Sequence, residues 1–272
     1  MEKTFMTAQE AFIKKDADTM REMLAPYKHA HFLVSHGNLG DQLIFAGTRN
    51  LLGKLEKAHT PPYLGTKYSE HLLQEAPGGE LALISGGGAW CRTWEGFMAE
   101  HLPLIEAKYD KVIVLPSSFQ MTDKIDATIR ASNKTTFIAR ELVSYNLIRH
   151  YHQGTALMHD MAFHYDFTPY RKWNGNGNGA GDRVLVSYRK DDERDKSIVW
   201  PANNEDTSHM KGTVEDWLRH LAEYDTIKTD RAHVMIAGAM LGKMVLYRPS
   251  NYHKVPAIAD FSLKGLPVYL SH

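Results

Sequence analysis

The chain has 272 residues, of which 43% are hydrophobic and 24% are charged, a composition that excludes a disordered protein and predicts a sizeable folded core. The 32 Lys and Arg residues balance the 32 Asp and Glu residues, which argues against a protein held to nucleic acid or anionic lipid by its overall charge. The single cysteine, Cys91, excludes an intramolecular disulfide and a zinc cluster built from cysteines.

The first predicted element is an amphipathic helix over residues 5–24. This stretch is charged and lacks the apolar core of a signal peptide. No apolar run approaches the ~20 residues that a helix needs to cross a bilayer. We therefore expect a cytoplasmic protein, either free in solution or peripheral to the inner face of the membrane.

From residue 29 onward, a short apolar run repeatedly leads into a polar corner and then into a helical pattern. "HAHFLVS" (29–35) precedes "HGNLGDQ", "ELALIS" (80–85) precedes "GGGAW", and "KVIVLP" (111–116) precedes "SSFQ". Continuous apolar strands that alternate with amphipathic helices are typical of parallel sheets with both faces covered. The expected fold class is α/β, with doubly wound, Rossmann-like parallel sheets.

One low-complexity segment interrupts the pattern, "WNGNGNGAGDR" at residues 173–183. Alternating Asn and Gly tolerate positive φ and offer nothing to pack, which predicts a flexible loop or a linker. The chain is then either two domains or a single sheet with a long loop. The two-domain interpretation is favoured, with an N-terminal domain over 1–172, a linker over 173–182 and a C-terminal domain over 183–272.

Unusual polar clusters stand where the predicted strands end. In an open parallel sheet, ligands bind at the carboxyl ends of the strands, so a shared position there indicates a site. A purely solvated surface would scatter such residues over both ends of the sheet. In chain order, the clusters are Asn38, Gly40 and Asp41; Gly86, Gly87 and Gly88; Ser117 and Ser118; Arg140 and Glu141; Asp160; Arg189; and Asp230, Arg231 and His233.

Each cluster also has a purely structural interpretation. Asp41 and Asp230 are good helix N-caps, and Ser117 and Ser118 could cap the following helix. Three consecutive glycines could form a tight turn, or could let a ligand approach the backbone of residues 86–88 closely. No GxGxxG, Walker or GxSxG motif surrounds these corners, which argues against the corresponding nucleotide sites and against a serine hydrolase.

The start of the helix after residue 229 carries the strongest functional signal. With Asp230 as the N-cap, Arg231 falls at the first helical position and His233 at the third. Two cations at the positive end of a helix are unfavourable by about 0.3–1 kcal/mol each, and a bound phosphate or carboxylate would reverse that repulsion. His233 there could give or take a proton. In the structural alternative, Asp230 balances part of the charge.

Two further stretches hold ionisable residues without a recognisable motif. The first is a group of histidines with one aspartate: His150, His152, His159, Asp160 and His164. Its spacing matches no HExxH motif, so a neutral histidine-rich surface is favoured over a metal cluster. The second, "RKDDERDK" at 189–196, predicts a solvated charged loop in which only Arg189 is a site candidate.

Six motifs, in their order along the chain, resemble those of the polysaccharide pyruvyl transferases. That family has a GN–GD helix start, a GGG turn, a strand end of the LPQS type, an RE or RD helix start followed by Ser, and a late DRLH followed by an apolar helix and Lys. The resemblance covers roughly residues 33–256. The matching stretches are "GNLGDQLI", "GGGAW", "VLPSSF", "ARELVSY", "HDMAF" and "TDRAHVMIAGAMLGKMVLYRPSNYHKV".

The resemblance implies a glycosyltransferase-B-like pair of Rossmann-type domains that face a central cleft. It places the acceptor on the N-terminal domain and the phosphate and carboxylate of the donor on the C-terminal domain. The implied donor is phosphoenolpyruvate, whose enol carbon is transferred to two hydroxyls of a sugar. The products are a pyruvate ketal and phosphate, in the synthesis of exopolysaccharide or another glycan of the cell envelope. This scheme requires no metal and no organic cofactor.

The same resemblance suggests roles for individual residues. The doubly anionic donor needs at least two cationic anchors, for which Arg231 and Arg140 are the first choices and Arg189 is the third. His233 is the candidate general acid, general base or both, and Asp41 is a further catalytic candidate. The other residues expected to bind substrate are Asn38, Gly40, Gly86, Gly87, Gly88, Ser117, Ser118, Asp230 and Lys254.

Two other functions stay open at this level. A glycosyltransferase of the same architecture would use Arg231 and His233 to hold the diphosphate of a nucleotide sugar or the phosphate of a CMP-sugar. A non-catalytic relative would bind glycan or anion without turnover. The expected partners are phosphoenolpyruvate and a sugar or glycan acceptor, which is lipid-linked, nucleotide-linked or polymeric, with no nucleic acid. The sequence identifies neither the acceptor sugar nor the oligomeric state.

Overall fold

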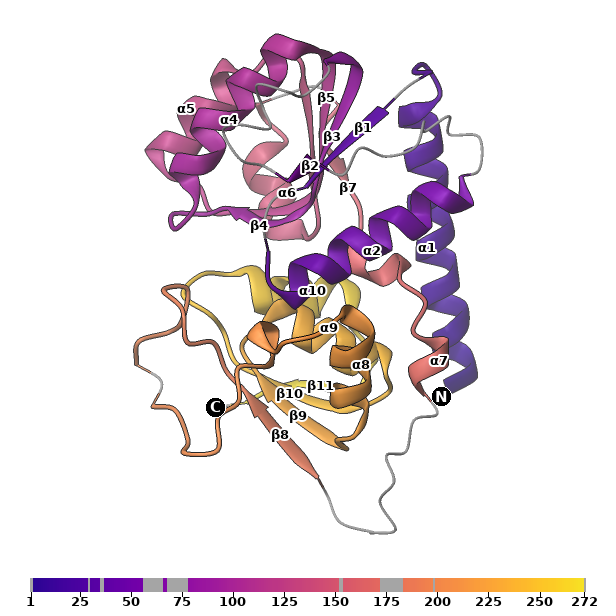
Figure 1. The fold of residues 1–272 in the computed structure, drawn as a ribbon, viewed down its shortest axis with the longest axis vertical. Coiled ribbons are helices and arrows are strands. Elements are labelled where there is room, and N and C mark those ends of the chain that lie inside the picture. Colours follow the sequence, from indigo (N-terminus) through magenta and orange to yellow (C-terminus); the bar gives the residue numbers. More distant parts are fainter. Residues whose placement is uncertain are drawn as a thin grey trace. The chain divides into compact units, whose positions relative to one another are not determined.

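The computed structural model describes residues 2–28, 30–34, 37–55, 66–67, 78–151, 154–171, 183–197 and 199–271. The chain divides into two compact units (Figure 1). Unit 1 comprises Met1–His36 and Gly47–His164, and unit 2 comprises Gly37–Ala46 and Tyr165–His272. The predicted linker, residues 173–182, lies outside the described residues, and the domain boundary predicted there stays a prediction.

Unit 1 is built on a parallel sheet whose main path, in the described residues, has six strands. Their order is β2-β1-β3-β5-β6-β7, and β4 pairs with β5 off this path. All of these pairings are parallel. The strands are β1 (Ala30–Val34), β2 (Thr66–Lys67), β3 (Gly79–Ile84), β4 (Gly87–Trp90), β5 (Tyr109–Phe119), β6 (Thr135–Ala139) and β7 (Ala156–Leu157).

The helices of this part of the chain alternate with the strands, as the sequence predicts. The first predicted helix is present and begins slightly earlier than residue 5. Helix α2 has its first turns in unit 2 and its later turns in unit 1. The elements are α1 (Glu2–Leu24), α2 (Leu39–Lys54), α4 (Glu95–Lys108), α5 (Asp123–Ala131), α6 (Leu142–Ile148) and the 3₁₀ turn η1 (Met161–His164).

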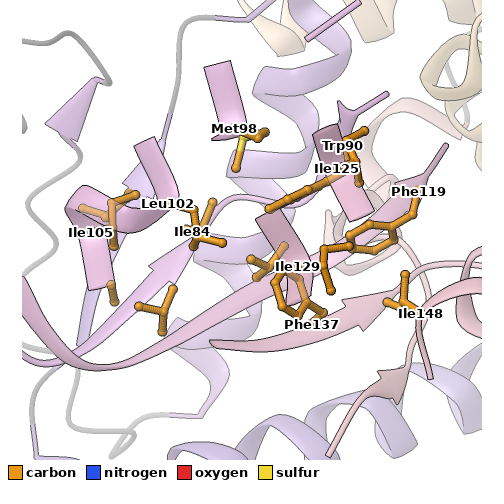
Figure 2. Close-up of a cluster of buried hydrophobic side chains, with 14 of the residues drawn as sticks. Ile84, Trp90, Met98, Leu102, Ile105, Phe119, Ile125, Ile129, Phe137 and Ile148 are labelled. Atoms are coloured by element: carbon orange, nitrogen blue, oxygen red, sulfur yellow. The ribbon is translucent and has the colours of Figure 1, made fainter. Parts of the chain in front are cut away.

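The sheet of unit 1 is buried on both faces. The four consecutive residues from Leu81 to Ile84 in β3 are each at most 2% exposed, although neighbours along a strand point to opposite faces. On one face, side chains of α4, α5 and α6 pack against the strands (Figure 2). The ring of Phe137 lies there with its centroid 5.4 Å from that of Trp90 and 6.1 Å from that of Phe119. The apolar runs thus form strands covered on both sides, as predicted.

Unit 2 contains a smaller parallel sheet of four strands in the order β11-β10-β9-β8. The strands are β8 (Val184–Ser187), β9 (Thr226–Thr229), β10 (Met244–Tyr247) and β11 (Val268–Leu270). The helical elements are α7 (Thr168–Arg171), the 3₁₀ turn η2 (Thr207–His209), α8 (Val214–Ala222), α9 (Ala232–Met240) and α10 (Lys254–Ser262).

Helix α9 is almost fully buried because its sequence, AHVMIAGAM, is almost entirely apolar. Every residue from Val234 to Met240 is buried. A Cβ atom on Gly238 would come 3.0 Å from side-chain atoms of both Ile227 in β9 and Val245 in β10, so glycine lets the helix lie close to the sheet. Helix α9 therefore packs closely against β9 and β10.

The predicted α/β class with parallel sheets is confirmed. Within the part of the chain that the structure describes, no helix is both long enough and apolar enough to cross a membrane.

Replacing Phe137 with Ala should lower the free energy of unfolding by about 3–5 kcal/mol, because the core closes only part of the cavity left by a large ring. Urea unfolding followed by circular dichroism measures the change. The matched control is Leu104→Ala in α4, where the residue is 53% exposed and the change should stay within about 0.5 kcal/mol. Equal effects of the two substitutions would contradict the core described here.

Candidate functional site

Arg140 forms a buried ion pair in unit 1. It directly follows β6 and is 1% exposed. Its Nε donates to Ser118 Oγ at 2.8 Å, and its Nη1 donates to Asp160 Oδ2 at 2.7 Å. Asp160 is also buried, and its Oδ1 accepts from the backbone N–H of Ala162 at 2.8 Å. A carboxylate of the same unit therefore already neutralises this predicted donor anchor.

The two serines predicted to follow the third strand lie inside a strand instead. β5 (Tyr109–Phe119) runs through both Ser117 and Ser118. Ser117 Oγ donates to the backbone carbonyl two residues earlier at 2.8 Å, and Ser118 accepts from Arg140. The predicted capping role is wrong, since the N-cap of α5 is Thr122. Both serines are polar groups satisfied within the buried sheet.

The three glycines have structural reasons of their own. A Cβ atom on Gly86 would come 2.4 Å from the carbonyl oxygen of Pro116, so only glycine permits this approach of two backbone segments. Gly87 has a φ of 128°, a conformation that side chains disfavour. Gly87 and Gly88 begin β4, and α4 starts only at Glu95, so the tight turn into a helix, one of the two interpretations of these glycines, is wrong. Packing and backbone conformation thus account for Gly86 and Gly87.

In unit 2, the start of α2 forms a capping box. Asn38 Oδ1 accepts from the backbone N–H of Gly40 at 2.8 Å and of Asp41 at 3.4 Å, and Asp41 Oδ2 accepts from the backbone N–H of Asn38 at 3.0 Å. The N-cap is therefore Asn38 and not Asp41, which corrects the prediction. A Cβ atom on Gly40 would come 2.6 Å from Nδ1 of His233. The imidazole lies directly against the first turn of α2.

Helix α9 begins at Ala232 with Arg231 as its N-cap, so the prediction that Asp230 caps this helix is wrong. Asp230 Oδ1 instead accepts from the backbone N–H of Arg189 at 2.7 Å. His233 becomes the second helical residue, in the turn whose backbone N–H groups lack partners within the helix. The start of α9 retains the partial positive charge that favours an anion, and His233 lies in that turn.

Arg231 is the centre of a buried group of charges. Its Nε and Nη2 donate to the two carboxylate oxygens of Asp206, each at 2.5 Å, and Nη2 also donates to Asp191 Oδ2 at 3.0 Å. The side chains of Arg231 and Asp206 are each 5% exposed. The prediction that Arg231 is an uncompensated cation at this helix start is therefore wrong, because two carboxylates of unit 2 neutralise it.

Arg189 and Lys254 belong to the same group of charges. Arg189 Nε donates to Asp191 Oδ1 at 2.8 Å, and its Nη2 lies 3.2 Å from Asp191 Oδ2 and 3.1 Å from Glu193 Oε2. Lys254 donates to the same oxygen of Glu193. We call this connected set of three cations and three carboxylates the arginine network; its members are Arg189, Asp191, Glu193, Asp206, Arg231 and Lys254.

The surroundings of two carboxyl groups shift their pKa values in opposite directions. Burial favours a raised pKa for Asp191, but the hydrogen bond from Arg189 and the charges of Arg189 and Arg231 outweigh it and lower the pKa well below its usual range. For Asp230, burial outweighs the same two arginines and raises the pKa to about 6. Asp191 is therefore ionised at neutral pH, whereas Asp230 takes up a proton in mildly acidic solution.

The acidic half of the arginine network was not predicted from the sequence. The charged composition of residues 189–196 predicts a solvated loop, yet the side chain of Glu193 is only 8% exposed. One signal was available: Asp191 and Glu193 follow Arg189 at spacings of two and four, directly after an apolar strand. Asp206 gave no such signal, since it lies 25 positions from Arg231.

The predicted histidine-rich surface is wrong for the buried Asp160 and for two of its histidines. His159 Nδ1 lies 3.1 Å from Asp16 Oδ2, and Nε2 of the buried His164 lies 3.8 Å from the same oxygen. His152 lies outside the described residues. Across the described ranges, no group of three or more His, Cys, Asp or Glu side chains is placed to hold a metal ion.

One family model matches this chain over residues 38–247, and its description is polysaccharide pyruvyl transferase. The match spans more than half of the chain. The chain belongs to the polysaccharide pyruvyl transferase family. The matched residues of this family member include the start of α2 at Asn38 and the network from Arg189 to Arg231, while Lys254 lies beyond them.

A search of solved structures gives a similar fold for this family member. The crystal structure of an uncharacterised protein from Klebsiella pneumoniae subsp. pneumoniae matches with a TM-score of 0.73 and 22% sequence identity. The match covers 93% of this chain and 98% of that chain. At this identity the likeness shows the fold alone. The chain matches none of the curated proteins.

Asp230→Asn should change how stability depends on pH. The folded protein raises the pKa of Asp230 from an ordinary value of 3.8 to about 6, so it binds a proton more tightly than the unfolded chain. Stability is therefore lost as the pH rises through this range, and the loss is complete above it. Because Asn carries no charge, the variant should gain at most about 3 kcal/mol relative to wild type between about pH 4 and pH 8.

Urea unfolding at several pH values between those limits measures this gain. The control is Asp260→Asn in α10, an exposed aspartate of the same unit, which should show little pH-dependent difference. A difference between Asp230→Asn and wild type that stays constant with pH would contradict the burial of this carboxyl group.

Proposed function

We propose that the protein is a pyruvyl transferase that moves the enolpyruvyl carbon of phosphoenolpyruvate onto two hydroxyls of a sugar, forming a pyruvate ketal in glycan or exopolysaccharide synthesis. Family membership supports the reaction class. The observation that carries the assignment to unit 2 is the pair Arg189 and Arg231, which follows the adjacent strands β8 and β9 at the start of α9. Guanidinium groups bind carboxylate and phosphate in a bidentate manner, and this donor carries both.

In this proposal, Arg231 and Arg189 are the donor anchors, and the start of α9 adds its partial positive charge. Lys254 acts through Glu193, and Asp230 acts through the backbone of Arg189. Arg140, with Ser118 and the other candidates of unit 1, is assigned to the acceptor side, because its carboxylate partner Asp160 is 1% exposed and is costly to displace. Arg189 and Arg231, in contrast, share the partly exposed Asp191. That assignment keeps the donor within one compact unit.

His233 is the proposed general acid and base. Protonation of the methylene carbon of phosphoenolpyruvate makes the neighbouring carbon an oxocarbenium-like centre, which the first sugar hydroxyl attacks while losing its proton. Phosphate then leaves, and the second hydroxyl closes the ketal as its proton passes to the phosphate. A single residue can donate the first proton and accept the next one, which balances the transfer.

The position of His233 supports this role. Its imidazole packs against the turn formed by Asn38, Gly40 and Asp41, and its backbone belongs to the first turn of α9. We propose that Asp41 acts on catalysis by holding that turn through the capping box. The imidazole is thus positioned next to the place where the start of α9 favours an anion.

Incubation with phosphoenolpyruvate and a panel of glycan acceptors tests the proposal. The expected result is release of phosphate together with an acceptor product heavier by one pyruvate minus one water. Thermal shifts separate the alternatives, because a ligand that binds the folded state raises the melting temperature. Stabilisation by nucleotides but not by phosphoenolpyruvate would favour a nucleotide-sugar glycosyltransferase. Binding of donor and glycan without turnover would favour a non-catalytic relative.

His233→Gln should lower kcat by about 10²–10⁴ while the KM for phosphoenolpyruvate changes only a few-fold, because glutamine keeps a polar side chain but does not transfer protons at neutral pH. Phosphate release at saturating donor and acceptor measures kcat. His209→Gln, at an exposed histidine of η2, is the matched control and should keep wild-type activity. Full activity in His233→Gln would remove the proposed acid and base.

A further inference from the structure

One carboxylate of the arginine network differs from the others in its exposure. The side chain of Asp191 is 39% exposed, compared with 8% for Glu193 and 5% for Asp206. It lies between β8 and η2, where the described residues form neither helix nor strand before η2 begins. The carboxylate of Asp191 is already in contact with water and can leave the network at a smaller solvation cost than the other two.

Asp191 contacts the two arginines in the way that a bound anion would. Its Oδ1 accepts from Arg189 Nε at 2.8 Å, while its Oδ2 accepts from Arg189 Nη2 at 3.2 Å and from Arg231 Nη2 at 3.0 Å. One carboxylate thus bridges two guanidinium groups. A carboxylate or phosphate of a ligand forms bonds of this same kind. Asp191 therefore occupies the position at which a small anion would meet both arginines.

We propose that Asp191 is a displaceable internal competitor of the donor. Its carboxylate holds Arg189 and Arg231 in the free protein, and an anionic group of the ligand takes its place on binding. Naming that ligand as phosphoenolpyruvate rests on the proposed function. The exchange of Asp191 for a phosphate group does not.

The charges that remain when Asp191 has left the arginine network support the proposed displacement. With Asp191 in place, three cations of the network face three carboxylates. When Asp191 has left, each arginine still keeps a buried partner, which is Glu193 for Arg189 and Asp206 for Arg231. Departure of Asp191 makes the surroundings of the two arginines more positive by one charge and thus favours an anion, whereas a ligand bound beside an unmoved Asp191 would meet a negative charge at close range.

The exchange also gives the site a preference among anions. A ligand must bind the arginines more strongly than a carboxylate that is already tethered there. A phosphate dianion meets this requirement better than a monoanion such as acetate or chloride, because the Coulomb energy grows with the ligand charge. Asp191 would thus lower the affinity for every anion by a similar factor, so that only ligands which bind the arginines strongly, such as dianions, still displace it.

Asp191→Asn tests the inference, because it keeps the shape of the side chain and removes its charge. Isothermal titration with inorganic phosphate, and separately with phosphoenolpyruvate, measures affinity in a buffer of low chloride. We expect the variant to bind both ligands at least about tenfold more tightly than wild type. The matched control is Asp192→Asn, an exposed neighbour with the same change of charge, which should stay within about twofold.

Equal or weaker phosphate binding by Asp191→Asn than by wild type would overturn the inference. Phosphate binding needs no turnover, so tighter binding without pyruvyl transfer to any acceptor would support the exchange and count against the proposed function. Pyruvyl transfer by the wild type, together with unchanged phosphate affinity in Asp191→Asn, would support the proposed function and overturn the exchange.

Hydrogen exchange on the wild-type protein provides a test that does not depend on the folding of a variant. Asp191 Oδ1 accepts from the backbone N–H of Glu193 at 3.1 Å, and this bond should break when Asp191 leaves. Saturating phosphate should therefore speed amide exchange around residue 193 while it protects the start of α9. Slower or unchanged exchange around residue 193 would contradict displacement.

Discussion

A buried guanidinium group must have an anionic partner, and this requirement shapes the end of unit 2 where the candidate site lies. Arg231 is 4% exposed and is held by both oxygens of Asp206. An unpaired charge at this depth would cost several kcal/mol, so the segment that carries Asp206 has to lie against the start of α9. The segment around Asp206 thereby acquires a fixed position, although the described residues between β8 and η2 form neither helix nor strand.

Much of the fold could be predicted because its determinants are local. The runs at Leu81–Ile84 and Phe137–Ala139 are continuous, apolar and short, which is typical of strands covered on both faces. Helix α9 could be predicted because its apolar run is longer than such a strand. The positions of Ser117 and Ser118 were less predictable, because a polar pair usually ends a buried strand. Here a backbone carbonyl and Arg140 satisfy the two hydroxyls inside β5, and such partners are set by the tertiary fold.

The sequence predicted the two arginines of the candidate site but not the carboxylates that pair with them. Arg189 stands out because it follows an apolar strand and Arg231 because it precedes an apolar helix, and their location at adjacent strand ends agrees with that reasoning. The carboxylates that neutralise them could not be predicted in this way, since one of them, Asp206, is far from both arginines in the sequence. The composition of the run 189–196 predicts that all of its charged side chains are solvated, whereas Asp191 is partly exposed and Glu193 is buried. Charge balance therefore cannot be read from neighbouring residues alone.

A site for a doubly charged donor needs arginines that are paired in the free protein but can still be reached by the ligand. If every partner were buried and permanent, no ligand could reach the guanidinium groups. If there were no partner, the cations would not stay buried in the free protein. The network satisfies both demands, because Asp206 and Glu193 stay with Arg231 and Arg189 while the more exposed Asp191 shares the remaining donors. In the proposed exchange, the arginines are held in place before the donor binds, and binding replaces one anion with another without ordering two long side chains.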